Sequence, residues 1–455
     1  MLFHSATFLA FTVVLVALYW LAPWQRARLV LLFASSLVFY GWRHWPSVFL
    51  LLASIGVNYG FGLLLEKKPS KHLLALGVTL NLSFLAYFKY GRFVVDQLIS
   101  LSALLGHELP APKLDAWMPL GISFFTFQVV AYLVDVYRKE IPAERSILVF
   151  AVFKSFFAQL VAGPIVRGKE FLPQLREKRA FEPSGLHRGA WLILCGLFLK
   201  VAVADVIGDY VDHAWRTTDT LGINNAWLTI YAYAAQLLAD FWGYSTMAVG
   251  LGLCFGLTLP VNFENPYGSS SLREFWTRWH ITLSGWLRDY LYISLGGNRV
   301  SRSRAAFNRL VTMALGGLWH GAGWNFLIWG FLHGLWMDLE LATTKLRERW
   351  PKWLGLLITF HVVVFLWIPF RAPSFSALTL MISRLFTAPW DVSTPPQTLV
   401  MTIGFLVLQK PLFALVRAER AETLKPVAQA ALAAAMVWLL LAYGCARQDF
   451  IYYFF

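Results

Sequence analysis

Charged residues are scarce in this sequence. Asp, Glu, Lys and Arg make up only 14% of the 455 residues, whereas hydrophobic residues make up 58% and the mean hydropathy is +0.57. About a quarter of the residues in a soluble domain are charged, so most of this chain must face lipid or other buried helices. Its long apolar runs lack the polar–apolar alternation of barrel strands. They predict an all-α polytopic membrane protein.

Several catalytic motifs are absent as well. The sequence has no GxxxxGK[ST] phosphate loop, no GxSxG nucleophile elbow, no HExxH zinc motif and no DxD pair. ATP-driven transport, serine hydrolysis and a metal site therefore have no support, and we expect no bound cofactor. Cys195, Cys254 and Cys445 are far apart and form no CxxC pair, which argues against a disulfide framework.

The positive charge of the chain lies in short loops. The formal net charge is +14, but the basic residues sit between apolar runs, as in cytoplasmic loops of membrane proteins, so we do not expect a nucleic-acid partner. The first apolar run, 1–21, has no basic leader and predicts a retained spanning helix rather than a cleaved signal. Alternation of the basic loops predicts that both termini lie outside the cytoplasm.

The apolar runs predict helices in the following ranges: 7–22, 29–41, 48–65, 73–88, 117–137, 191–204, 226–259, 310–318, 324–341, 353–370, 399–415 and 427–443. The run 147–161 is short and has basic flanks on both sides, so we expect it to be re-entrant. The run 226–259 is too long for one straight span and predicts a span followed by a broken or buried segment. The segment 91–116 is expected to be an outer loop.

Two ionisable positions interrupt the apolar runs. An acidic outer loop is expected to contain Asp205, Asp209, Asp212 and Asp219. Lys200 is expected to extend its ammonium group to the interface rather than to pair with Asp205. Asp240 is either a functional intramembrane group or the donor or acceptor of a structural hydrogen bond to a neighbouring helix.

The segment 271–321 combines seven arginines with His280 and His320. Aromatic and aliphatic residues recur at helical spacing over 262–309, which predicts interfacial helices. Either they anchor the chain in membrane lipids, or their arginines form a rim that binds an anionic cytosolic substrate. The sequence leaves both open.

His320 is the sharpest candidate for chemistry. An imidazole within an apolar helix is costly unless it is paired or faces a cavity, so it is either a hydrogen-bonded packing residue or a functional group. A buried neutral imidazole can take a proton from a hydroxyl as it attacks a carbonyl, which suits acyl transfer. On one continuous helix His333 would lie about 220° around from His320, so we expect His333 to be a packing residue.

Several segments carry a resemblance that covers most of the chain. PVNFENPYGSSSLREFWTRWHITLSGWLRDYLYISLGGNR from Pro260 and LGGLWHGAGWNFLIWGFLHG from Leu315 are the most specific. They are joined by YFKYGRF from Tyr87, PLGISFFTFQ from Pro119 and AGPIVR from Ala162, and by QLLADFWGYSTMAVGLG from Gln236. Together they resemble the membrane-bound O-acyltransferase family, in particular its bacterial alginate O-acetylation branch. Trp242 and Thr246 depart from the family pattern, so we assign Thr246 no role.

The resemblance implies a fold, a reaction and partners. It implies a ring of about 11 transmembrane helices with re-entrant and interfacial helices around a central funnel, formed by a single domain over 1–455 with a catalytic core at about 115–345. The expected enzyme lies in the bacterial inner membrane and moves an acetyl group from acetyl-CoA for O-acetylation of an exported polysaccharide such as alginate or cellulose. Expected partners are an extracytoplasmic SGNH-type acetyltransferase and a polysaccharide export or synthesis complex.

The same resemblance assigns residues. His320 corresponds to the buried catalytic histidine and His280 to a second histidine near it. The ending FIYYFF resembles a C-terminal motif whose tyrosine is proposed to carry the acyl group, which here is Tyr452; an interfacial aromatic anchor is the alternative for the tail 446–455. The expected substrate-binding residues are Arg273, Arg278, Arg288, Asp289, Asn298 and Trp319.

Other functions remain open at this point. A carrier or channel without chemistry would need the same helices, and so would a scaffold for an envelope acylation complex. Acylation of peptidoglycan or teichoic acid would use the same chemistry on a different polymer.

Overall fold

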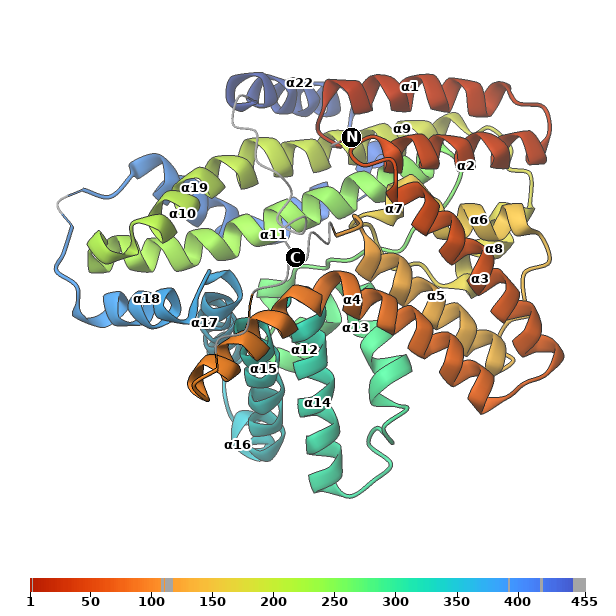
Figure 1. Ribbon diagram of the computed structural model, residues 1–455. Helices are drawn as coiled ribbons and strands as arrows, with labels where there is room; N and C mark the ends of the chain where they lie inside the picture. Colours follow the sequence, from red (N-terminus) through yellow and green to blue (C-terminus); the bar gives the residue numbers. More distant parts are fainter. Residues whose placement is uncertain (2, 108–109, 111–117, 392, 418–419, 445–455) are drawn as a thin grey trace. The chain divides into compact units, whose positions relative to one another are not determined.

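The regular elements of the protein are helices (Figure 1). The computed structural model describes residues 1, 3–107, 110, 118–391, 393–417 and 420–444. Within these residues no strand forms, and one isolated antiparallel bridge joins Phe263 and Trp279. The predicted all-α fold is therefore confirmed.

Contacts within the chain define two compact units. The first contains Met1–Phe181, Phe255–Leu259 and Gly321–Gly323, and the second contains Glu182–Cys254, Pro260–His320 and the described part of Trp324–Phe455. The single domain expected over 1–455 stays a prediction, and so do the ring and the funnel.

Among the residues that the structure describes, six helices are long and apolar enough to cross a membrane: Ser47–Lys67, Lys71–Leu104, Pro183–Arg216, Ile223–Cys254, Lys352–Arg371 and Pro426–Tyr443. A helix pair bent by 66°, Pro396–Val407 with Gln409–Leu415, adds a seventh if it counts as one span. The chain is thus a multi-pass membrane protein. The expected total of about 11 spans is not confirmed by the residues that the structure describes.

The first unit packs around a central apolar helix, α5. Its helices are α1 Ala6–Leu21, α2 Gln25–Gly41, α3 Ser47–Lys67, α4 Lys71–Leu104, α5 Ile122–Tyr137, α6 Ile147–Ser155, α7 Phe157–Leu160 and α8 Gly168–Arg176. Nearly every side chain of α5 is buried, so this helix faces protein rather than lipid. The re-entrant run expected at 147–161 is broken into α6 and α7, whose described side chains are mostly buried, as such a segment requires. Its re-entrant course stays a prediction.

The second unit contains the helices α9 Pro183–Leu197, α10 Val206–Arg216, α11 Ile223–Cys254, α12 Leu272–Arg278, α13 Ile281–Trp286, α14 Arg302–His320, α15 Trp324–Ala342, α16 Thr344–Arg347, α17 Lys352–Arg371, α18 Phe375–Thr387, α19 Pro396–Val407, α20 Gln409–Leu415, α21 Arg420–Thr423 and α22 Pro426–Tyr443. Two π-helical segments, η1 Phe198–Asp205 and η4 Leu287–Tyr292, and two 3₁₀ turns, η2 Thr218–Thr220 and η3 Pro266–Gly268, complete it. In Figure 1, α9 runs along α11.

Small residues let α9 and α11 approach closely. A Cβ atom added to Gly196 or to Gly243 would overlap the carbonyl oxygen of the other glycine, and Gly189 and Gly250 are related in the same way. In lipid, where the hydrophobic effect does not drive helices together, such close backbone contact supplies much of the association energy.

Two expectations about helix length were wrong, and a third was open between two alternatives. Helix α4 continues to Leu104, through most of the outer loop expected at 91–116. The run 226–259, expected to be a span followed by a broken or buried segment, is unbroken over the 32 residues of α11, and most side chains of this helix are buried. The acidic residues Asp205, Asp209 and Asp212 lie in η1 and α10 rather than in a loop. In each case polar residues were read as helix ends, although a helix satisfies its backbone groups whatever its side chains are.

The expectation for Lys200 was also wrong. Its ammonium nitrogen lies 2.6 Å from Asp205 Oδ1 and 2.8 Å from Asp240 Oδ1, and the three side chains are at most 2% exposed. The lysine therefore does not extend to the interface. It pairs with two carboxylates, and Asp240 is accounted for by this pairing between α11 and η1.

We predict that Lys200→Met destabilises the protein strongly, because it leaves two buried carboxylates without their ammonium partner. Breaking a buried ion pair costs about 3–5 kcal/mol, which thermal unfolding of the detergent-purified chain would register as a lower midpoint. The triple variant Lys200→Met/Asp205→Asn/Asp240→Asn removes all three charges and should recover most of the loss. A Lys200→Met protein that melts at the wild-type temperature would contradict this account.

Candidate active site

His280 lies at a break between two short helices of the second unit. The Ser271 hydroxyl caps α12 by accepting a hydrogen bond from the Glu274 backbone N–H at 3.0 Å. After α12 ends, His280 adopts φ 43° and ψ 55°, in the left-handed region, before α13 begins. A non-glycine residue in this region costs of the order of 1–3 kcal/mol and persists only where its surroundings hold it.

Asn262 holds the backbone at this break. Its carbonyl oxygen accepts a hydrogen bond from the Ile281 N–H at 3.0 Å, and its side-chain oxygen accepts one from the Thr282 hydroxyl at 2.7 Å. One residue further on, Phe263 forms the bridge to Trp279. The strained turn is thus fixed on both sides of His280, which fixes the direction of its imidazole.

His320 is the last residue of α14, and the close packing of α14 on α15 places it. A Cβ atom on Gly317 would overlap the carbonyl oxygen of Phe326, and one on Gly330 would overlap that of Met313. The two backbones are therefore in direct contact one turn before His320. Its ring lies 5.1 Å from the Trp329 ring centroid, at an interplanar angle of 89°.

The two histidines share one buried aromatic compartment. Their ring centroids are 6.4 Å apart, and His280 and His320 are 0% and 2% exposed. The Trp319 ring lies 5.9 Å from that of His280 and 5.0 Å from that of His320, and Phe241 packs edge-on against His280 at 4.7 Å. The structure thus brings together His280, His320 and Trp319, which the sequence singled out separately.

Burial keeps His280 neutral. Desolvation lowers the pKa of its imidazole from the usual 6.5 to about 3, because a buried site disfavours the charged form. At physiological pH the ring therefore offers one N–H donor and one lone pair. Such a group can hydrogen-bond a reacting hydroxyl without introducing a charge.

A third histidine belongs to the same cluster. His333, on α15, is fully buried, and its Nδ1 accepts a hydrogen bond from the Trp276 indole N–H at 3.2 Å. Its ring lies 4.8 Å from that of Trp329. His320 and His333 lie on two helices, α14 and α15, and not on one continuous helix, and both rings contact Trp329.

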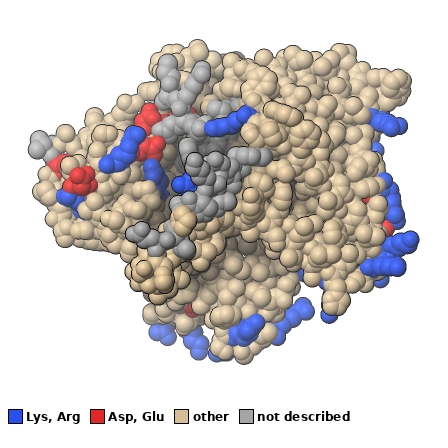
Figure 2. Space-filling view, viewed as in Figure 1, with Lys and Arg blue, Asp and Glu red and all other residues tan. Residues whose placement is uncertain are grey.

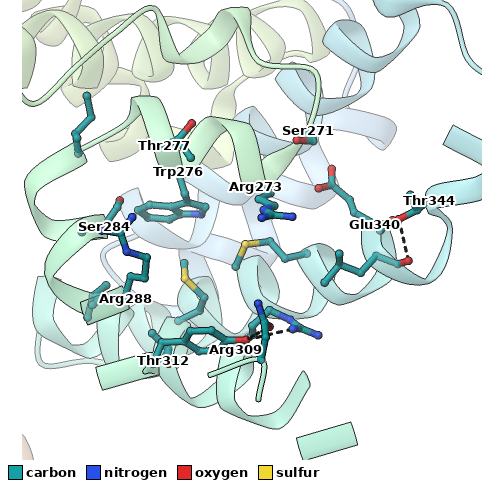
Figure 3. A pocket seen from close by; sticks show the side chains of 18 of the residues that line it. Ser271, Arg273, Trp276, Thr277, Ser284, Arg288, Arg309, Thr312, Glu340 and Thr344 are labelled. Carbon is teal, nitrogen blue, oxygen red and sulfur yellow. Dashed lines mark hydrogen bonds between the residues drawn. The ribbon is translucent and has the colours of Figure 1, made fainter. Parts of the chain in front are cut away.

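A pocket of about 640 Å³ opens beside the histidine cluster (Figure 3). Arg273, Arg288 and Arg309 approach the same space from α12, η4 and α14, and the Trp276 ring forms part of the wall. Neither His280 nor His320 lines this pocket, but Ile281, next to His280, does. The pocket therefore combines cationic forks, which suit phosphate oxygens, with an apolar wall that adjoins the buried compartment.

The surroundings of the pocket are basic. In the face shown in Figure 2, Lys and Arg side chains gather at the end of the second unit where α14 begins and α16 lies. Exposed members of this basic end are Arg302, Arg304, Lys345 and Arg349. An anion would be attracted to this end before it entered the pocket.

The predicted substrate-binding residues separate into two groups. Arg273, Arg288 and Asn298 line the pocket. Arg278 and Asp289 are absent from its lining: Arg278 pairs with Glu274 at 2.7 Å, and Asp289 pairs with Arg288 at 2.7 Å. The catalytic candidate Tyr452 lies outside the described residues, and its role stays a prediction.

Two further arginines line the pocket: Arg309 belongs to the predicted arginine rim but was not singled out, and Arg347 was not predicted. Arg309 pairs with Asp338 of α15, and Arg347 pairs with Glu340 at 3.2 Å. Arg347 lies outside the segment that was searched for an arginine rim, and only the turn between α14 and α15 brings it near. The one available signal was its place in the charged stretch KLRER, which resembles any solvated helix end.

Comparison with known proteins extends these observations. The sequence model of the membrane-bound O-acyltransferase family matches residues 113–382. The "Probable alginate O-acetylase AlgI" of Pseudomonas putida is 40% identical over 429 residues, which cover 90% of this chain and 86% of that protein. The protein of the same description from Azotobacter vinelandii is 41% identical, with 86% and 80% covered. A peptidoglycan O-acetyltransferase of Helicobacter pylori is 37% identical, with 76% and 72% covered.

The described helices thus hold two neighbouring buried histidines in a multi-pass membrane protein, with a pocket lined by arginines nearby. The family match covers more than half of the sequence, and the relatives align along most of it. The chain belongs to the membrane-bound O-acyltransferase family. The predictions of this family and of an O-acyltransferase are thereby confirmed.

We predict that Gly317→Ala lowers activity on the order of 100-fold, because the added methyl group forces α14 away from the Phe326 carbonyl and displaces His320. A misplacement of about 1 Å in a catalytic group can cost on the order of 100-fold in rate. The control is Gly404→Ala in α19, where a Cβ would meet no atom within 4 Å and activity should be retained. Equal activity of the two purified variants would argue against this packing constraint.

Proposed function

We propose that this chain transfers an acetyl group from cytosolic acetyl-CoA toward the outer face of the bacterial inner membrane, for O-acetylation of an exported polysaccharide. Alginate or a similar polymer, such as cellulose, is the proposed acceptor. The observation that carries the proposal is the buried pair His280 and His320, 6.4 Å apart between ring centroids, in a chain 40% identical to alginate O-acetylases. The names of those relatives support the polymer class.

His320 is the proposed general base. In this mechanism its imidazole takes the proton of an acceptor hydroxyl while the hydroxyl oxygen attacks the thioester carbonyl carbon. The C–S bond then breaks, the new C–O ester bond remains, and the imidazolium returns the proton to the departing thiolate of CoA. His280 is the second proposed catalytic residue: as a neutral ring it would hydrogen-bond the acceptor or the developing oxyanion.

The arginine-lined pocket is the proposed donor site. Acetyl-CoA carries several phosphate charges, and guanidinium groups bind phosphate through bidentate hydrogen bonds. Arg273, Arg288, Arg309 and Arg347 line one space that can hold such charges. Asn298 lines the same pocket, whereas for Arg278, Asp289 and Trp319 a direct donor contact stays a prediction from sequence.

The basic end of the second unit supports a cytoplasmic position for the pocket, since positively charged segments stay on that side. Both termini are proposed to lie outside the cytoplasm. The proposed partners are an extracytoplasmic SGNH-type acetyltransferase and a polysaccharide export or synthesis complex. Tyr452 is the proposed residue of this chain that carries the acyl group before it passes to a partner.

Acetylation of peptidoglycan is the second candidate function. The 37% identity to a peptidoglycan O-acetyltransferase favours it over other polymers. The chemistry at His320 would be the same for both polymers. The two functions are distinguished by isolating the exported polysaccharide and the peptidoglycan from a strain that lacks the gene and measuring which of them has lost its acetyl groups.

We predict that His320→Ala lowers acetyl transfer by a factor of about 100 to 10,000, the usual contribution of a general base. The measurement is release of free CoA from acetyl-CoA by the purified chain in lipid vesicles, together with the acetyl content of the exported polymer. His361→Ala, a histidine of α17 that hydrogen-bonds its own helix at Leu357, serves as the control and should remain active.

If His320→Ala retains full acetylation, the base assignment is wrong. If the wild-type chain releases no CoA while acetylation in cells still depends on it, the protein is a carrier or scaffold.

We predict that Arg273→Gln raises KM for acetyl-CoA about tenfold, since a hydrogen bond to a charged group contributes about 1.5–3 kcal/mol. If the pocket lining defines the donor site, Arg278→Gln, on the same helix but outside that lining, should leave KM within twofold, and this result would overturn the donor contact predicted for Arg278 from sequence. Steady-state kinetics on the two purified variants decides the question. The reverse ranking would place the donor against the other side of α12.

A further inference from the structure

His333 is a buried polar residue that the proposed reaction does not use. It is 0% exposed, and Trp329, Trp367 and Phe275 surround its ring at 4.8, 6.2 and 6.4 Å between centroids. Its Nε2 has no hydrogen-bond partner among the residues that the structure describes. Burying a nitrogen in this way costs stability, which an apolar side chain of similar size would avoid.

The hydrogen bond of His333 leads to the wall of the pocket. Its Nδ1 accepts from the indole N–H of Trp276 at 3.2 Å, which places the ring proton of the neutral imidazole on Nε2. Trp276 lines the pocket and is itself 8% exposed. The bond therefore fixes the orientation of an indole that a ligand in the pocket would touch (Figure 3).

The other side of His333 leads to His320 through Trp329. The Trp329 ring lies 4.8 Å from that of His333 and 5.1 Å from that of His320, edge-on to both. Trp329 is 1% exposed and also stacks on Trp367 at 5.5 Å, so it has little room to rotate. Side chains packed this closely keep their rotamers only while their neighbours keep theirs.

We infer that His333 is a positioning residue, which through Trp276 and Trp329 holds the pocket wall and the His320 imidazole in one fixed relation. A donor seated against Trp276 then presents its thioester to His320 in reactive geometry. His333 itself touches neither donor nor acceptor. The inference rests on the proposed function, in which His320 is the base and the pocket holds the donor.

The test uses variants of the full-length chain that distinguish the effect of the aromatic ring of His333 from the effect of its hydrogen-bond acceptor, Nδ1. His333→Phe keeps an aromatic ring without an acceptor, whereas His333→Asn keeps an acceptor near Nδ1 without the ring. Trp276→Phe removes the indole donor from the other side. Acetyl-CoA kinetics gives kcat and KM, and calorimetric titration with desulfo-CoA, which lacks the thiol, gives donor affinity without chemistry.

We expect His333→Phe and Trp276→Phe each to lower kcat by about 10- to 100-fold, the effect of a misplaced catalytic group. The affinity of His333→Phe for desulfo-CoA should stay within about threefold of wild type, because His333 does not touch the donor. The double variant should be no slower than the slower single variant, since both remove the same bond. His333→Asn should recover most of kcat.

Trp336→Phe, which removes an indole elsewhere on α15 and outside the pocket lining, is the control and should keep its kcat. A kcat of His333→Phe equal to that of wild type would overturn the inference, and so would additive losses of kcat in the double variant. If His320→Ala is inactive in the same experiment, the proposed function is unaffected by this result. If His333→Phe does not fold, the test uses Trp276→Phe and His333→Asn instead. A kcat of Trp276→Phe equal to that of wild type then overturns the inference. An active His320→Ala would instead show that the proposed function has failed.

Discussion

The direct backbone contact between α14 and α15 is the constraint on which the candidate site depends. Gly317 and Gly330 each face a carbonyl oxygen of the opposite helix with no room for a methyl group. This contact places His320, at the end of α14, against Trp329 of α15. It also sets the spacing of the pocket, because Arg309 comes from one helix of the pair and Glu340 from the other. A membrane protein can stabilise such contact by van der Waals packing, without help from the hydrophobic effect.

The second unit handles its buried polar groups in two different ways. Lys200 is paired, because two carboxylates lie within hydrogen-bond distance of its side-chain nitrogen. His280 instead remains neutral, because its surroundings are aromatic and burial lowers its pKa to about 3. The first arrangement connects η1 with α11, and the second keeps an uncharged imidazole in the aromatic compartment. A compartment that excludes water also strengthens every dipole aimed at a developing charge, which suits the proposed acyl transfer.

The class of fold and His320 could be identified from the sequence for reasons that are local, whereas His280 was assigned through the family resemblance. Long apolar runs predict membrane helices wherever they occur, and an imidazole in such a run is costly in any fold. Predictions from the sequence failed where tertiary contacts decide. Lys200 looked like an interfacial lysine because its partner Asp240 is 40 residues away. Arg347 and the Trp276–His333 bond were not predictable, because they depend on tertiary packing: the bond joins α12 to α15, across 57 residues of sequence.

The measurement that tests the central claim most directly is a structure of the full-length chain, determined by electron cryomicroscopy, with a non-cleavable acetyl-CoA analogue. The account predicts that the phosphates lie against Arg273 and Arg309 and that the acetyl carbonyl carbon lies within roughly 6 Å of the His320 ring, room for one acceptor oxygen between them at about 3 Å from each. An analogue bound elsewhere, or one whose acetyl group points away from His320, would contradict it.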